Sequence, residues 1–370
     1  MLTFTNSYLV TNRQPASGGY GSHPHASGAL SYLTAPTPGS GVNYQSDVGQ
    51  YSLVDEGNTT GDTLPAAFAS ALISDLQLTV VDTQPAQLTV FIHGLDTDWT
   101  GAATDLGLVG TGLQGMSATG GCLMSYDAGS QSCQALPLNT TYGGLIIGFS
   151  WPDVPLGLDF IGDFHATRIQ ANTSGPSLAN LLQALAGLAS NFAGGLTLNI
   201  LAHSEGTYVT QQVAASLPAG QAAIINQVLL LAADLDTTAL GPYAHKAACG
   251  IGLSQAAAQV TAYWSTGDDV LGDVGIFPSY ILTQLWGPCV RDGTIGRLGK
   301  SGPPADQTLY ANCLTLDCSA VVTKAQTCSN EKTHVAYFYM PLVLQDMAQV
   351  LNGQSPSGRS GTGSRQTLND

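Results

Sequence analysis

Short runs of apolar residues recur along the chain, and most of them are followed by glycine or by polar residues. Runs of five or six residues rich in Val, Ile and Leu are typical of strands buried in a parallel sheet. We assign such strands to residues 88–92, 145–150, 196–201, 228–233 and 260–265. Alternating apolar and polar residues predict another strand at 76–81, and runs at 8–10 and 51–54 predict edge strands.

Helical spacing of apolar residues follows several of these strands. Pro176 is expected in the first turn of a helix that ends at Gly194. The apolar face of this helix is formed by Leu178, Leu181, Leu182, Leu185, Leu188 and Phe192. Similar spacing predicts a helix after residue 204 and a last helix at about 335–352. Strands that alternate with helices predict an α/β fold, in which a mostly parallel sheet carries helices on both faces.

Other stretches show neither the strand nor the helix spacing of apolar residues, and they divide the chain into regions. Residues 1–75 are rich in Gly, Ser, Pro and Thr and are expected to form a loop-rich segment with edge strands. The α/β domain is predicted at 76–353, with long loop or lid insertions at 96–142 and 272–332. The Ser- and Gly-rich tail, 354–370, is expected to be disordered.

The charge of the chain narrows the classes of function. Only 9% of its 370 residues are charged and the net charge is −15. A nucleic-acid-binding protein needs Lys and Arg for the phosphates, and docking on anionic lipid needs the same residues, so both functions are disfavoured. No apolar run is long enough to span a membrane, and no signal peptide is evident in the sequence as written.

The seven cysteines of the chain bear on metal binding and on the cellular compartment. They lack the spacing of a zinc site, and no cofactor motif is present, so neither a metal nor a cofactor is expected. Disulfides across the long loops fit better, with Cys122–Cys133 as the one specific pair that we predict. Disulfides form in oxidising compartments, so we expect a secreted protein. The alternative is a cytosolic protein with buried free thiols.

A serine follows the strand at 196–201 and precedes a helical pattern. Ser204 has small residues two positions before and after it, Ala202 and Gly206. A sharp turn from strand to helix exposes such a serine, and small neighbours let the turn close. The pattern predicts a nucleophile elbow, although similar strings also arise by chance in a chain rich in Gly and Ala.

A second strand end supplies the expected oxyanion donor. The strand at 88–92 continues into His93 and Gly94, and the backbone N–H of Leu95 is predicted to face the developing oxyanion. The N–H of Glu205 is the predicted second donor. The Glu205 carboxylate would oppose an oxyanion, so it must point into solvent or pair with a cation. For His93 we favour a packing role over a chemical one.

A serine nucleophile needs a base, and the base needs a carboxylate that orients it. Asp268 and Asp269 follow the strand at 260–265, and we take Asp268 as the acid with Asp269 in reserve. Of the two histidines after Ser204, His245 precedes the acid strand, whereas His334 lies before the last helix. The predicted order is therefore nucleophile Ser204, acid Asp268 and base His334. Alternatively, Asp268 caps the following helix and His334 has no partner.

This ordered set of segments resembles the α/β-hydrolase superfamily, and most closely a bacterial branch of esterase-like serine hydrolases. The segments that carry the resemblance span roughly residues 76–352 and read FIHGL, GFSWPD, ILAHSEGTY, LLLAADLD, WSTGDDVL and THVAYFY. The resemblance implies the same roles for Ser204, Asp268 and His334. The chain departs from the family pattern at Ala202, at Glu205 and in its long cysteine-bearing loops.

Taken together, these features predict a secreted carboxylic-ester hydrolase of the esterase or lipase type that acts on a small-molecule, lipid or polymeric ester. His93, Trp151 and Trp264 are candidate cleft residues, and Trp99 and Trp286 are further candidate walls. A serine peptidase or an acyltransferase would use the same residues. A non-catalytic binding or surface protein on a hydrolase fold is the alternative from another class, and a metalloenzyme ranks third because no zinc-binding motif is present.

Overall fold

The computed structural model describes residues 6–17, 19–25, 27–36, 54–59, 61–95, 97–115, 124–127, 132–153, 160–217, 224–242, 251–274, 298–322 and 333–369. In this part of the chain an 11-stranded sheet runs in the order β14-β15-β13-β12-β11-β10-β6-β9-β1-β4-β5. Neighbours from β15 to β1 are parallel. The outer pairs β14–β15, β1–β4 and β4–β5 are antiparallel. The predicted fold class is confirmed.

The strands of the large sheet are β1 (Asn6–Thr11), β4 (Leu30–Pro36), β5 (Val54–Thr59), β6 (Ala86–Ile92), β9 (Leu145–Ser150), β10 (Leu196–His203), β11 (Ile225–Leu231), β12 (Ala257–Trp264), β13 (Cys313–Asp317), β14 (Arg359–Thr362) and β15 (Arg365–Leu368). Two separate hairpins consist of β2 (Arg13–Ala16) with β3 (Gly19–Pro24) and β7 (Met124–Asp127) with β8 (Ser132–Ala135). The helices are α2 (Ala66–Gln77), α3 (Trp99–Leu113), α4 (Phe160–Ala186), α5 (Gly206–Ser216), α6 (Ile251–Ala256), α7 (Asp269–Val274), α9 (Leu298–Ser301), α10 (Ser319–Val322) and α12 (Pro341–Leu351), with 3-10 turns η1 (Gly187–Asn191) and η4 (Thr333–Phe338).

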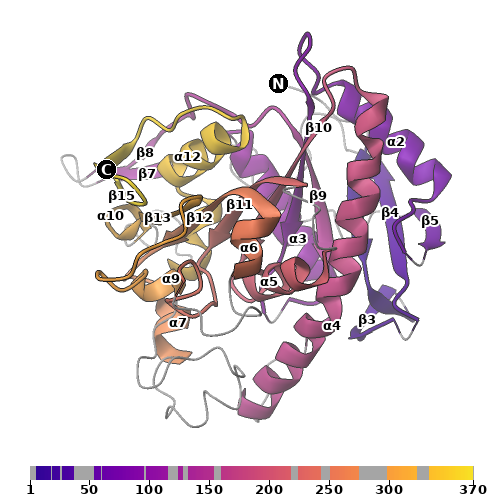
Figure 1. Ribbon diagram of the computed structural model, residues 1–370, viewed down its shortest axis with the longest axis horizontal. Helices are drawn as coiled ribbons and strands as arrows, with labels where there is room; N and C mark the ends of the chain where they lie inside the picture. Colours follow the sequence, from indigo (N-terminus) through magenta and orange to yellow (C-terminus); the bar gives the residue numbers. More distant parts are fainter. Residues whose placement is uncertain are drawn as a thin grey trace.

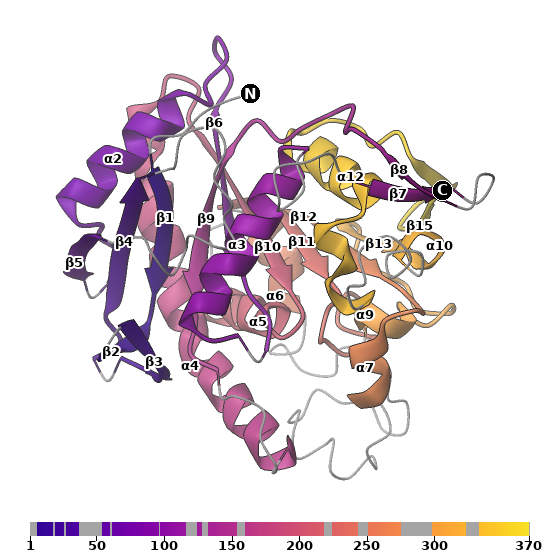
Figure 2. The same ribbon diagram turned by 180° about the vertical axis from the view of Figure 1, so that it is seen from behind.

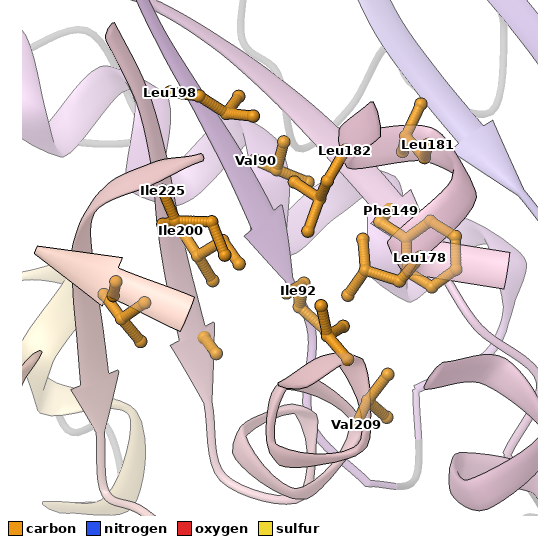
Figure 3. Packing of buried hydrophobic residues seen from close by; sticks show 14 of the residues in the cluster. Val90, Ile92, Phe149, Leu178, Leu181, Leu182, Leu198, Ile200, Val209 and Ile225 are labelled. Carbon is orange, nitrogen blue, oxygen red and sulfur yellow. The ribbon is translucent and has the colours of Figure 1, made fainter. Parts of the chain in front are cut away.

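Helices cover both faces of the sheet because successive strand residues point to opposite sides. Val90 and Ile92 of β6 pack into a core with α2, α4, α5 and α6, whereas Phe91 between them packs against α3, η4 and α12. Figure 1 shows α4 and α5 in front of the sheet, and Figure 2 shows α3 and α12 from behind. Figure 3 shows Leu178 and Val209 meeting the strand residues of the first core.

The expected strand at 76–81 is wrong, because the chain forms α2 up to Gln77 and then a turn. Phe68, Leu72 and Leu76 are fully buried at a spacing of four residues, which is the face of a helix. The alternation after Leu76 is a coincidence within this longer pattern. The predicted boundary between residues 75 and 76 consequently falls inside a helix.

The sequence pattern predicts only part of helix α4 and does not predict helix α3. Pro176 does not begin its helix but lies inside α4, which starts at Phe160. The proposed loop 96–142 contains α3, whose buried Ala102, Val109 and Leu113 form a helical face that the many Gly and Thr residues obscure. Both corrections have the same cause, because residues with poor helix propensity become helical when one face packs on a sheet.

The tail predicted to be disordered, 354–370, is ordered in its described part, 354–369. Strands β14 and β15 form a hairpin that adds to the sheet beside β13, and β13 lies inside the predicted insertion 272–332. Arg359 fixes this hairpin on α12 through Asp346, with Arg359 Nε 2.6 Å from Asp346 Oδ2. Charge pairing therefore orders a segment whose composition predicts no core.

Two of the seven cysteines, Cys313 and Cys318, are buried free thiols, so they do not pin loops as expected. Burial raises the pKa of the Cys313 thiol to about 12, which keeps it protonated. The predicted Cys122–Cys133 pair lies outside the described side chains. Among the described helices, none has the length and apolar character needed to cross a membrane.

Candidate active site

Ser204 lies in the turn between β10 and α5, where the backbone adopts a conformation rare for any residue but glycine. Its φ is +51°, in the left-handed region. Hydrogen bonds hold the turn: Ser204 N donates to Leu231 O at 2.9 Å, and Thr207 Oγ1 donates to Ser204 O at 2.6 Å. A Cβ at Gly206 would clash with the carbonyl of His93, which explains why a glycine stands two residues after the serine. This is the geometry of a nucleophile elbow.

Asp268 and His334 are brought together from elements 66 positions apart. His334 Nδ1 lies 2.8 Å from Asp268 Oδ2, and Asp268 is fully buried. The other carboxylate oxygen of Asp268 accepts the N–H of Leu271 at 2.8 Å. Asp269 contacts the backbone rather than the ring, because its Oδ1 accepts His334 N–H at 3.1 Å. Thus Asp268 binds the imidazole of His334, and Asp269 binds the backbone N–H of the same histidine.

His203, the residue before the serine, contacts His334 directly. Its Nε2 donates to the His334 carbonyl at 2.9 Å, and the two ring centroids lie 4.8 Å apart. Burial, and then the charge on His334, lowers the pKa of His203 to about 3, so this ring is neutral. Among the described residues, no hydrogen bond joins Ser204 to His334. Catalytic bonds of this kind often tighten only when substrate is bound.

The expected oxyanion donor Leu95 follows a glycine that packs on the serine. A Cβ on Gly94 would lie 2.9 Å from Ser204 Cβ and 3.2 Å from His203 Nδ1. The Leu95 N–H makes no hydrogen bond to any described residue, although its carbonyl accepts Thr97 Oγ1 at 3.2 Å. An N–H that makes no such bond, on the residue after this glycine, is compatible with the predicted role of oxyanion donor.

The Glu205 carboxylate is fully buried and pairs with a cation, which was one of its two predicted solutions. Arg168 Nε lies 3.0 Å from Glu205 Oε1, and Arg168 Nη2 lies 2.8 Å from Asp234 Oδ2. The guanidinium also stacks on the ring of Tyr208, 3.9 Å from its centroid. The sequence gives no signal for Arg168, because it lies in the part of α4 before Pro176, where no helix is predicted. The positive charge of Arg168 offsets the negative charge of Glu205, which reduces the repulsion that this carboxylate would exert on an oxyanion.

His93 and Trp151 do not line a cleft, because their exposed fractions are 1% and 0%. Trp151 Nε1 donates to His93 O at 2.9 Å, and the two rings stack with centroids 5.5 Å apart. His93 has a pKa of about 3, lowered chiefly by burial and then by the charge on Arg13, so it packs as a neutral ring. Trp264 is partly exposed and lies against Gly302, Trp99 is partly exposed beside Tyr20, and Trp286 lies outside the described residues.

A mostly parallel sheet with a strained serine after a central strand, and an Asp–His pair after later strands, defines the α/β-hydrolase class. The family model of alpha/beta hydrolases of unknown function (DUF900) matches residues 69–275, more than half of the chain, and the protein belongs to that family. The match includes Ser204 and Asp268, whereas His334 lies beyond it. The search of curated proteins gave no match. Within the described residues, no cluster of His, Cys, Asp and Glu could hold a metal ion.

Proposed function

We propose that the protein is a serine carboxylic-ester hydrolase in which Ser204, His334 and Asp268 act as nucleophile, base and acid. The observation that carries the proposal is the 2.8 Å contact between His334 Nδ1 and Asp268 Oδ2. His203, the residue before Ser204, contacts His334, so this pair lies next to the turn that carries the serine. A carboxylate on Nδ1 leaves Nε2 of the ring to accept a proton, which is the tautomer a general base needs.

The proposed reaction runs in two halves. Ser204 Oγ attacks the ester carbonyl while His334 Nε2 takes its proton, and the imidazolium then gives that proton to the departing alcohol. Water, deprotonated by His334, attacks the acyl-enzyme, and the acid leaves as Ser204 recovers its proton. The N–H groups of Leu95 and Glu205 stabilise the oxyanion in both halves, each by roughly 3–4 kcal/mol in comparable sites.

The charge of the chain favours a neutral substrate over an anionic one. Few Lys and Arg residues are present and the net charge is −15, so a neutral substrate meets less repulsion than an anionic one. The same residues would also serve a peptidase or an acyltransferase, and the family implies a small-molecule substrate. Secretion stays a prediction that rests on the low charge of the chain and on its cysteine count.

Hydrolysis of p-nitrophenyl esters tests the proposal. Wild-type protein should release p-nitrophenol, and Ser204→Ala should lower kcat by at least about a thousandfold with an unchanged circular dichroism spectrum. Turnover in Ser204→Ala equal to that of wild type would overturn the assignment. A panel of short esters, triglycerides and polyesters would then separate esterase, lipase and polyester hydrolase activities.

A further inference from the structure

Asp153 is a buried carboxylate just after β9, and both of its oxygens have partners. Its Oδ2 accepts the backbone N–H of Thr97 at 2.7 Å, and its Oδ1 lies 3.1 Å from Arg13 Nη2. Both charged residues have exposed fractions of 2%. Charges that are buried to this degree depend on their hydrogen-bond and ion-pair partners, because water does not solvate them.

Arg13 holds the other side of the same peptide segment. Its Nη2 donates to the carbonyl of Thr97 at 2.7 Å, and its Nε donates to Ser150 Oγ at 2.9 Å. The N–H and the C=O of one residue, Thr97, are therefore bound by opposite members of one ion pair. Since the ion pair binds both backbone polar groups of Thr97, it fixes the position and orientation of the backbone at this end of the segment.

The other end of this segment is held from the same strand end. Trp151 binds the carbonyl of His93 through its indole, and its backbone N–H donates to His93 Nε2 at 3.2 Å. His93 Nδ1 in turn contacts the carbonyl of Gly94 at 2.8 Å. Two residues of one short stretch, Trp151 and Asp153, thus hold positions 93 and 97, and Leu95 lies midway between them.

We propose that Asp153 and Arg13 are positioning residues that keep the Leu95 N–H directed at the reacting carbonyl, in concert with Trp151. This inference rests on the proposed function, because it assigns a role toward the oxyanion. Among the described residues, no hydrogen bond joins either member of the ion pair to Ser204, so we assign its effect to the segment that ends at Thr97. Nothing in the reaction requires the pair to change its protonation.

The chemical reason is that an oxyanion donor contributes only when its geometry is held in advance. A donor displaced by about 1 Å loses much of its effect on the transition state, while ground-state binding of the ester changes little. Loosening the segment should therefore lower kcat and leave KM nearly unchanged. A purely structural ion pair would instead lower the folded fraction and leave the kinetics of the folded molecules as they are.

Asp153→Asn tests the proposal, with Asp346→Asn as its matched control. Asp346 also pairs with an arginine, the partly buried Arg359, but it lies on α12 and fixes the C-terminal hairpin. We expect kcat on a p-nitrophenyl ester to fall about 10- to 100-fold in Asp153→Asn with KM within about twofold. In Asp346→Asn, kcat per folded molecule should stay within about twofold of wild type.

The affinity for an alkyl boronic acid supplies a second readout, since its adduct with Ser204 carries an oxygen in the oxyanion site. This affinity should fall by about the same factor as kcat in Asp153→Asn and stay unchanged in Asp346→Asn. The proposal is overturned if Asp153→Asn, corrected for its folded fraction, matches Asp346→Asn in both kcat and boronate affinity.

Trp151→Phe keeps the test decisive if Asp153→Asn fails to fold. This variant removes the indole N–H donated to His93 and retains an aromatic ring over the imidazole. Its kcat and boronate affinity should fall by at least about fivefold together, and no change in either quantity would overturn the proposal. If the wild type neither hydrolyses esters nor reacts with a fluorophosphonate at Ser204, the proposed function itself fails, and this inference fails with it.

Discussion

The imidazole of His203 donates a hydrogen bond to the backbone carbonyl of His334 at 2.9 Å. The residue that precedes the proposed nucleophile therefore holds the loop that carries the proposed base. Because a carbonyl only accepts, Nε2 of His203 carries the proton, and its low pKa keeps the ring in that neutral form. This contact connects the end of β10 to η4 across 131 positions of sequence.

Replacing His203 with Phe keeps an aromatic ring and removes the donor. The His334 carbonyl then loses its buried partner, which should cost about 1–3 kcal/mol of unfolding free energy and lower kcat by about tenfold. Phe338→Leu is the control, because the Phe338 ring packs on the His203 ring, with the two centroids 4.8 Å apart, and makes no hydrogen bond to it. Chemical denaturation and ester kinetics on both variants check this prediction, and equal kcat values in the two variants would refute it.

Acid should destabilise the fold through two buried histidines. Burial, together with nearby positive charge, lowers the pKa of His93 and of His203 to about 3, so both rings are neutral in the folded state at pH 5. The unfolded chain takes up a proton on each below about pH 6.5, so it binds more protons than the folded chain.

Stability should therefore fall as the pH falls from about 6.5 toward 4, with each histidine contributing about 1.4 kcal/mol per pH unit. Denaturation of wild type and His203→Phe at several pH values measures the two slopes. The slope of the variant should be smaller by roughly one histidine's share. Identical slopes would show that His203 is not a source of the acid sensitivity.

Gly94 should tolerate no side chain. A Cβ at this position would lie 2.9 Å from Ser204 Cβ, so Gly94→Ala should displace the serine or the oxyanion segment and lower kcat by at least about tenfold. Gly110→Ala is the control, because a Cβ there in α3 would meet nothing within 4 Å. That helical substitution should stabilise the protein by up to about 1 kcal/mol and leave kcat unchanged. A Gly94→Ala enzyme with wild-type kcat would contradict the close packing described here.

Arg168 should be essential to stability, because it is the cation between two buried carboxylates. Arg168→Met leaves Glu205 and Asp234 without it and should cost about 3–5 kcal/mol. Adding Glu205→Gln removes one of these two buried negative charges and should restore part of this loss. A double-mutant cycle by urea denaturation measures the coupling, and additive losses would show that Arg168 and Glu205 do not interact.

The central strands could be predicted from the sequence because their residues are apolar on both faces. The places of Ser204 and Asp268 after strands, and of His334 before the last helix, could be predicted because those elements have clear apolar patterns. The alternation at 76–81 predicts a strand because this segment contains only the last residues of α2, and its helical face lies before them. Arg168 could not be assigned, because a guanidinium inside a helix with Gly and Pro carries no local signal of its partners. The contact between His203 and His334 depends on how distant segments pack, which sequence spacing does not specify.

Reaction with a fluorophosphonate, followed by peptide mass mapping, tests the central claim most directly, since it asks whether Ser204 is an activated nucleophile. The account predicts a single stoichiometric adduct on Ser204 that disappears in Ser204→Ala and forms far more slowly in His334→Ala. A folded wild-type protein that gains no adduct, or gains one on another residue, would contradict it.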